Sequence, residues 1–183
     1  MRALIIYESM YGNTRAVAEA VAAGLRTACE ADVKPVAAVA EVTEAAESDV
    51  DNVDLLVVGG PTHAHGLSRP SSRNAAAKAA ETDDDLTLEP GARGPGLREW
   101  LQHLDGGAGR RAAAFDTRLS APPIFTGRSS LHVAKRLRQL GFEIADEPVS
   151  FFVDMKNRLV EGELERAQEW GRRLLGQAAE RSG

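Results

Sequence analysis

Short runs of consecutive apolar residues constrain the fold of this chain more than any other feature. Residues 3–7 (ALIIY) and 55–58 (LLVV) are such runs, and residues 110–116 contain a third, from Ala112 to Phe115. Runs of this length indicate strands buried on both faces, because a half-exposed strand alternates apolar with polar residues. Strands buried on both faces are typical of a parallel sheet covered by helices on either side.

Segments of helical periodicity separate these runs. The predicted helices cover residues 14–27, 41–47, 69–81, 96–106, 128–140 and 161–178. Further strands are predicted at 32–37, where Pro35 indicates an edge strand, and at 142–145 and 149–153. In the helix over 128–140 the inward face is predicted to carry Leu131, Ala134, Leu137 and Leu140. The alternation predicts an α/β fold with three layers, in which helices flank a doubly wound, five-stranded parallel sheet.

Length and composition limit the domain count and the class of partner. A chain of 183 residues suffices for one buried core, so we expect a single domain over 1–183, with a loop insertion at about 82–96. The net charge of −5 argues against nucleic acid as a partner. No run approaches 18 apolar residues, so no membrane insertion is expected. The single cysteine, Cys29, suits a reducing compartment, and we expect a cytoplasmic protein.

The loop that follows the first strand has the chemistry of an anion site. Residues 8–14 (ESMYGNT) join the strand to a helix, at the sheet edge where ligands bind in open parallel sheets. Hydroxyl groups come from Ser9 and Thr14, and Gly12 permits a tight turn. The start of the following helix adds partial positive charge. The alternative is a simple turn in which Asn13 or Thr14 caps the helix.

Residues 5–14 (IIYESMYGNT) resemble the FMN-phosphate signature of the flavodoxin family, in which an apolar strand precedes a hydroxyl-x-x-Gly-Asn-Thr loop. The resemblance implies the strand order 2-1-3-4-5 and FMN as the cofactor, bound where the winding direction reverses. The phosphate-binding residues that it implies are Ser9, Met10, Tyr11, Gly12, Asn13 and Thr14.

A second loop, residues 57–66 (VVGGPTHAHG), falls where flavodoxin-like proteins place their first flavin-flanking loop. Gly59 and Gly60 are expected to let the backbone approach the ring. The implied flavin contacts are Pro61, Thr62, His63, Ala64, His65 and Gly66. With the first loop, this segment is also similar to the tryptophan-repressor-binding type of NAD(P)H:quinone oxidoreductase. Histidines stand where electron-shuttling flavodoxins usually carry an aromatic residue, and no metal site is predicted from the His63-x-His65 pair.

A third loop follows the strand at 110–116, at the position of the family's second flavin-flanking loop. The flavin contacts that the resemblance implies there are Phe115, Asp116, Thr117 and Arg118. Arg118 is expected either to place positive charge near the flavin, which favours two-electron chemistry, or to be a surface charge. Phe115 is also a candidate core residue.

Other proteins of this fold class lack support in the sequence. A response-regulator receiver needs an aspartate where Gly59 and Gly60 end the third strand, and a small tyrosine phosphatase needs a cysteine in the first loop rather than Cys29. We therefore expect an FMN-binding redox protein that acts in electron transfer, with a redox partner protein or a small-molecule quinone. The alternatives are an FMN-dependent NAD(P)H:quinone reductase, which would make the chain an oxidoreductase enzyme, and a cofactor-less interaction module. No catalytic side chain is predicted.

Overall fold

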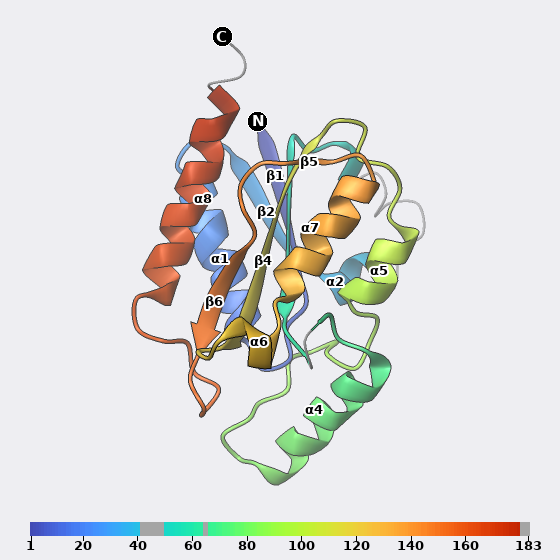
Figure 1. Cartoon of the computed structure of the whole chain (residues 1–183), viewed down its shortest axis with the longest axis vertical. Coiled ribbons are helices and arrows are strands. Elements are labelled where there is room, and N and C mark those ends of the chain that lie inside the picture. The colour runs from blue at the N-terminus through green and yellow to red at the C-terminus, as the bar shows by residue number, and fades with distance from the viewer. Residues whose placement is uncertain (41–49, 64–65, 180–183) are drawn as a thin grey trace.

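A parallel sheet forms the centre of the molecule in a computed structural model that describes residues 1–40, 50–63 and 66–179 (Figure 1). β1 (Arg2–Tyr7) pairs with β2 (Glu30–Pro35) on one side and β3 (Leu55–Pro61) on the other. β3 also pairs with β4 (Arg111–Leu119). The chain thus winds first in one direction and then in the other from β1, which confirms the predicted doubly wound α/β fold and the predicted strand order.

The fifth position of the sheet is filled by two short strands in succession. β5 (Glu143–Ile144) pairs with the start of β4, and β6 (Val149–Val153) pairs with its end. Pro148, which has no backbone N–H to donate, immediately precedes β6. The sheet therefore has five positions, as predicted, but six strands.

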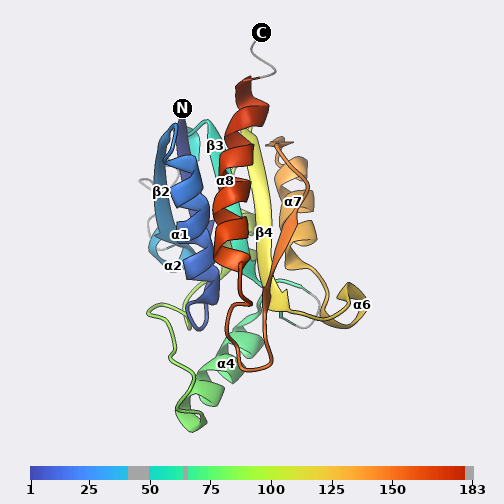
Figure 2. The same ribbon diagram turned by 90° about the vertical axis from the view of Figure 1, so that its left-hand side faces the viewer.

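Helices cover both faces of the sheet. α1 (Asn13–Leu25) and α8 (Glu163–Ala179) lie on one face, and α2 (Val36–Ala40), α5 (Leu97–His103) and α7 (Ser129–Gln139) lie on the other (Figures 1 and 2). Successive residues of the buried strands point to opposite faces, so that Ile5 packs with α1 and α8 whereas Ile6 packs with α5 and α7. Burial on both faces explains why these strands read as unbroken apolar runs.

Two local predictions differ from the structure, and a third falls on residues that the structure does not describe. Val36 belongs to α2 rather than to the edge strand, which ends at Pro35. Leu131 was predicted to face inward, but its side chain is 47% exposed, because α7 turns Ser130, Val133, Ala134 and Leu137 toward the sheet. The helix predicted at 41–47 lies outside the described residues.

Two helices lie beyond the carboxyl edge of the sheet, α4 (Pro70–Thr82) and the short α6 (Pro123–Thr126) (Figures 1 and 2). After α4, the segment 83–96 folds back onto the loop after β1. The Glu89 backbone N–H donates to the Met10 carbonyl at 2.8 Å, and the Glu89 carboxylate pairs with Arg15 at 3.2 Å. This segment therefore packs directly against the first candidate loop.

Candidate functional site

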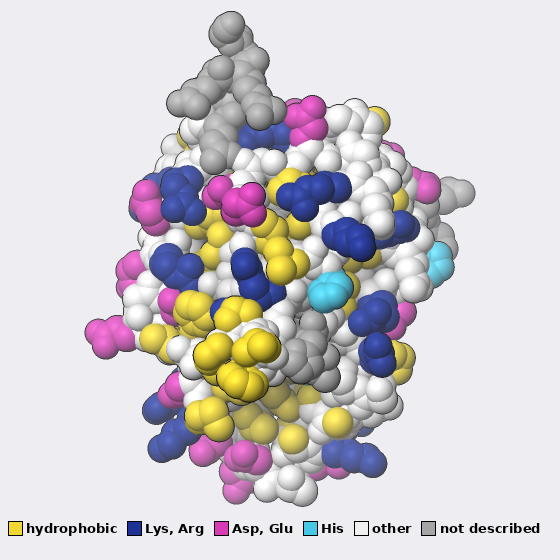
Figure 3. Space-filling view, viewed as in Figure 1, with side chains coloured by type: hydrophobic (Ala, Val, Ile, Leu, Met, Phe, Trp, Pro, Cys, Tyr) yellow, Lys and Arg dark blue, Asp and Glu magenta, His cyan; other side chains and the backbone are white. Residues whose placement is uncertain are grey.

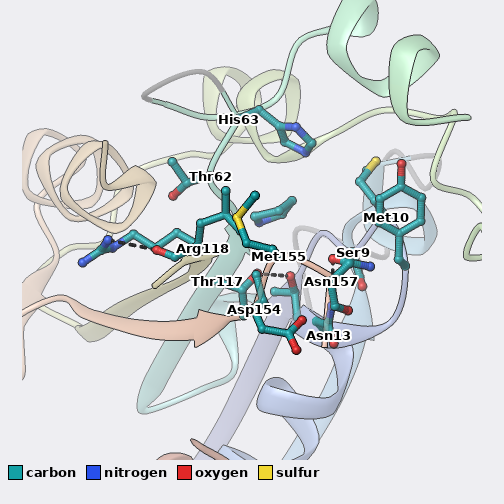
Figure 4. Close-up of a pocket in the computed structure, with 15 residues that line it drawn as sticks. Ser9, Met10, Asn13, Thr62, His63, Thr117, Arg118, Asp154, Met155 and Asn157 are labelled. Carbon is teal, nitrogen blue, oxygen red and sulfur yellow. Dashed lines mark hydrogen bonds between the residues drawn. The ribbon is translucent and has the colours of Figure 1, made fainter. Parts of the chain in front are cut away.

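A cavity of about 210 Å³ lies at the carboxyl ends of β1, β3, β4 and β6 (Figure 4). Its wall comes from four separate loops, because parallel strands all end at this edge of the sheet. Of the predicted site residues, those that line it are Ser9, Met10, Tyr11, Asn13, Thr14, Pro61, Thr62, His63, Thr117 and Arg118. The cavity thus joins the three loops that the sequence singled out.

The loop after β1 turns sharply into α1 at Gly12. Gly12 has a φ of 92°, a left-handed conformation that glycine adopts without steric cost, and its N–H donates to the Ser9 hydroxyl at 3.0 Å. No side-chain hydrogen bond caps α1. The first N–H groups of a helix have no partner within it, so the start of α1 presents free donors and partial positive charge beside the cavity.

Thr14 connects this loop to the end of β4. Its hydroxyl lies 2.7 Å from the Thr117 hydroxyl, and both residues are buried although both line the cavity. Either oxygen can donate in this pair. One hydroxyl hydrogen therefore remains for a further acceptor, such as a ligand oxygen.

Asn13 connects the same loop to the segment after β6. Its side-chain amide donates to the Asn157 backbone carbonyl at 2.8 Å and to the Asn157 side-chain oxygen at 3.0 Å. Asn157 has a φ of 56°, in the left-handed region that asparagine tolerates better than most residues. The Asn13 amide is therefore committed to holding two loops together.

Thr62 and His63 form the wall at the end of β3. The Thr62 hydroxyl accepts from the Ser129 backbone N–H at 3.0 Å, so it contacts the first turn of α7. The His63 ring points into the cavity (Figure 4), and its Nε2 is buried without a hydrogen-bond partner among the described residues. Burial lowers the pKa of His63, an effect that the Glu8 carboxylate opposes and Arg73 reinforces. A neutral imidazole thus faces the cavity at neutral pH.

The flavodoxin family model matches residues 5–97, which contain the first two loops of the cavity. The chain belongs to the flavodoxin family. No curated protein sequence is significantly similar to it.

Solved structures agree with the fold of this flavodoxin. A flavodoxin from the domain Archaea superposes with a TM-score of 0.65 at 16% identity, covering 98% of this chain and 99% of the other. Oxidised flavodoxin 1 from Bacillus cereus gives 0.63 at 20% identity, with 96% and 98% covered. A flavodoxin, WrbA-like protein from Agrobacterium tumefaciens gives 0.61 at 19% identity, with 98% of both chains covered. The family resemblance read from the sequence is confirmed.

The glycines at the end of β3 are required by core packing in this flavodoxin. A Cβ on Gly59 would lie 2.0 Å from the Phe115 ring, and one on Gly60 would lie 2.7 Å from a Leu97 methyl carbon. Real Cβ atoms do not approach other atoms so closely. These glycines therefore make room for core side chains on either side of the sheet.

Phe115 and Asp116 are buried and do not line the cavity of the flavodoxin. Phe115 packs edge-to-face on Phe151 and Trp170, with ring centroids 5.9 Å and 6.1 Å away. One Asp116 carboxylate oxygen accepts from the Ser130 backbone N–H at 2.8 Å, which fixes the start of α7. The core interpretation of Phe115 is therefore the one that the structure supports.

Arg118 lines the cavity, and its side chain extends away from Ser9 and Asn13 (Figure 4). The guanidinium donates to the Ala121 carbonyl at 2.6 Å and to the Thr126 hydroxyl at 3.0 Å, and it lies 4.8 Å from the centroid of the Phe152 ring. Burial lowers the pKa of Arg118, an effect that Asp116 opposes, but an arginine stays protonated. Arg118 therefore holds the α6 loop and keeps a buried positive charge at the cavity wall.

The remaining predicted residues lie elsewhere. Ala64 and His65 are outside the described residues. Gly66 lies in the wall of a neighbouring cavity together with His63, and its backbone pairs with that of His63 in an antiparallel bridge.

The end of β6 and the segment after it supply residues that were not predicted from the sequence. Val153, Asp154, Met155 and Asn157 line the cavity, as does Leu119 at the end of β4. The available signal was the strand predicted at 149–153, since the loop after any parallel strand of this sheet lies at the same edge.

No helix in the described part of the chain has both the length and the apolarity needed to cross a membrane. No group of three or more His, Cys, Asp or Glu side chains in the described ranges can hold a metal ion.

Proposed function

We propose that this flavodoxin binds FMN in the cavity at the carboxyl edge of the sheet and uses it to transfer electrons. The phosphate is held by residues 9–14, and the ring lies between the end of β3 and the end of β4. Bound FMN would supply the redox chemistry.

One observation carries the proposal: α1 begins at the cavity wall without a side-chain cap, beside the hydroxyls of Ser9 and Thr14. A phosphate monoester has several acceptor oxygens and negative charge, which match free N–H groups, hydroxyl donors and the positive end of a helix dipole. This donor set fits the phosphate of FMN without a lysine or arginine in the loop.

The surface beside the cavity supports exchange of electrons with a partner. Leu119, Ile124, Phe125 and Met155 are exposed apolar residues, and two of them, Leu119 and Met155, also line the cavity. Apolar side chains gather over α6 in the space-filling view (Figure 3). Exposed apolar patches mark interaction sites, so we place a redox partner protein or a quinone here. The single Cys29 suits the cytoplasmic location that we also propose.

Flavin binding tests the proposal directly. The purified protein is titrated with FMN and, separately, with riboflavin, while flavin fluorescence and visible absorbance are followed. We expect tight binding of FMN and clearly weaker binding of riboflavin, which lacks the phosphate. Absence of binding at micromolar FMN would reject the proposal and would favour a cofactor-less interaction module.

A second candidate function, an FMN-dependent NAD(P)H:quinone reductase, is favoured by one specific observation. A second cavity lined by arginine and histidine side chains adjoins the first, and His63 lines both. Anaerobic reduction of the FMN-loaded protein by NADPH, followed by reoxidation with a quinone, separates the two functions. A simple electron carrier would not be reduced by NADPH alone.

A further inference from the structure

The second cavity, of about 440 Å³, lies between the start of α4, α5 and α7. Its wall consists of His63, Gly66, Leu67, Arg69, Ser71, Ser72, Arg98 and His132. This volume exceeds the roughly 30 Å³ that one water molecule occupies in the liquid by an order of magnitude. The cavity is therefore large enough for a chemical group much larger than a water molecule.

The charge of this cavity is positive although the protein carries a net charge of −5. Its lining includes Arg69 and Arg98 but no carboxylate. Arg15 and Arg73, by contrast, are paired with Glu89 and Glu99. Arg69 has no ion pair with any described residue. Figure 3 shows Lys and Arg side chains gathered around a histidine on the face formed by α7 and α5.

Backbone contacts hold Arg98 in place without neutralising it. Its guanidinium donates to the Ser68 carbonyl at 2.9 Å and to the Leu67 carbonyl at 2.8 Å. Carbonyl groups carry no net charge, so the guanidinium keeps its full positive charge at a fixed position. A charge that is already fixed loses little conformational entropy when it binds an anion.

The start of α4 adds donors from another direction. Ser71 and Ser72 belong to its first turn and line the cavity, and α4 is 13 residues long. The Ser72 hydroxyl bonds to the Arg69 backbone, which anchors the residue that bears the unpaired guanidinium. Arginines, the Ser71 hydroxyl and the positive end of a helix together match a phosphate group, which has acceptors on several sides.

His63 lines both cavities, so a ligand in the second cavity lies next to the proposed flavin site. The Nε2 atom of His63 is buried and unpartnered among the described residues. We propose that the cavity of Arg69, Arg98 and His132 binds a phosphate group of the small molecule with which the bound flavin exchanges electrons. The ligand is thus an organic phosphate such as a nicotinamide dinucleotide. This inference rests on the proposed function, because the exchange of electrons requires FMN in the first cavity. Binding of a phosphate group in the second cavity does not itself require FMN.

Calorimetric titration of the FMN-loaded protein with sodium pyrophosphate, NADP⁺ and nicotinamide riboside tests the proposal. Arg69→Gln removes an exposed charge that has no ion pair with the described residues, and it should leave the fold intact. Arg138→Gln is the matched control, since Arg138 is exposed on α7 and does not line the cavity. Loss of one charged hydrogen-bonding group predicts a Kd roughly 10- to 100-fold higher for pyrophosphate and NADP⁺ in Arg69→Gln. Arg138→Gln should bind both as the parent protein does, and neither variant should change the binding of nicotinamide riboside.

Three results would overturn the proposal. The first is failure of the parent protein to bind pyrophosphate at millimolar concentration, and the second is an equal loss in Arg69→Gln and Arg138→Gln. The third is weaker binding of pyrophosphate in Arg69→Gln than in the parent protein, together with no binding of NADP⁺ by the parent protein. This result would assign the cavity to free phosphate rather than to an electron-exchanging partner. The pyrophosphate titration is repeated without FMN. A protein that binds pyrophosphate in this way but no flavin would contradict the FMN function and leave the anion site standing.

Discussion

The hydroxyl of Thr14, in the first turn of α1, lies 2.7 Å from the hydroxyl of Thr117, near the end of β4, 103 residues later in the chain. Thr14 is 1% exposed, so this contact is shielded from bulk water. It joins the proposed phosphate loop to one of the loops proposed to flank the flavin ring. Substitution of Thr14 and of Thr117, one at a time, therefore distinguishes a structural role of this hydroxyl pair from a role of Thr14 in ligand binding.

Thr14→Ala is expected to weaken FMN binding more than riboflavin binding. A hydrogen bond to a charged group contributes about 1.5–3 kcal/mol, so the Kd for FMN should rise roughly 10- to 100-fold. Fluorescence titration with both flavins measures the effect. Thr117→Val is the control, because it breaks the hydroxyl pair and leaves Thr14 free to donate to the phosphate. Equal losses for FMN and riboflavin in Thr14→Ala would show that Thr14 acts only through the loop structure.

Gly59→Ala should destabilise the protein, because the new Cβ would lie 2.0 Å from the Phe115 ring in the core. Overpacking of this kind costs about 1–3 kcal/mol of unfolding free energy, measured by urea denaturation. The control is Gly176→Ala in α8, where a Cβ meets no atom within 4 Å. Replacement of an exposed helical glycine by alanine should stabilise by about 0.5–1 kcal/mol. If Gly59→Ala is as stable as the parent protein, the close approach is relieved by a shift of Phe115.

Gly59 shows where a sequence is insufficient. Continuous apolar runs and helical periodicity predicted the strands and most helices, because burial on both faces leaves a strong local signal. The space beside Gly59 is occupied by Phe115, which is distant in sequence, so the reason for a glycine there became visible only with the fold. The exposure of Leu131 has a similar cause, since the inward face of α7 includes Ser130, a polar residue that contacts Asp116.

The candidate site likewise combines residues that could be predicted from the sequence with residues that only the fold reveals. Ser9, Asn13 and Thr14 belong to a local motif next to a strand, and their position at the cavity could be predicted from the sequence. Asp154, Met155 and Asn157 form no motif, and they reach the cavity because β6 ends beside β4. When a residue lies in a site only because of the order of the strands, it can be found only after every strand of the sheet has been placed.

Asn13→Ala should loosen the contact between the phosphate loop and the segment after β6. It removes the amide that donates to both the backbone carbonyl and the side-chain oxygen of Asn157. Loss of hydrogen bonds at a partly buried site should lower the unfolding free energy by about 1 kcal/mol. Asn157→Gly should cost less, since it keeps the carbonyl acceptor and suits the φ of 56°. Urea denaturation of both variants is compared with Asn74→Ala, a change at an exposed position of α4. An equal effect of all three substitutions would contradict a specific loop contact.

Arg118→Ala should lower the midpoint potential of bound FMN. Arg118 keeps a buried positive charge at the cavity wall, and positive charge favours the reduced, more negative flavin. An interaction of about 1–2 kcal/mol corresponds to roughly 20–45 mV for a two-electron couple. Spectroelectrochemical titration measures the potential, and Arg138→Ala controls for the change in net charge. An unchanged potential in Arg118→Ala would leave its guanidinium with the sole role of holding the α6 loop.

His63 should make the protein less stable as the pH falls. Burial lowers the pKa of His63 in the folded state, whereas in the unfolded chain histidine titrates near its ordinary value of about 6.5. Between these two pKa values the unfolded chain binds the proton more readily, so protons shift the equilibrium toward unfolding. The contribution of His63 to stability is therefore complete well above pH 6.5 and is lost as the pH falls toward the pKa of the folded state.

Urea denaturation at a series of pH values from 5 to 8 measures this contribution in the parent protein and in His63→Gln. The variant should lose less unfolding free energy between neutral and acidic pH, because it has no imidazole to protonate. His103→Gln is the matched control, since His103 is exposed near the end of α5. Identical pH dependence in the parent protein and His63→Gln would mean that the cavity accepts an imidazolium without cost. The carboxylate of Glu8, which favours the charged ring, is the group that would then compensate for the burial of His63.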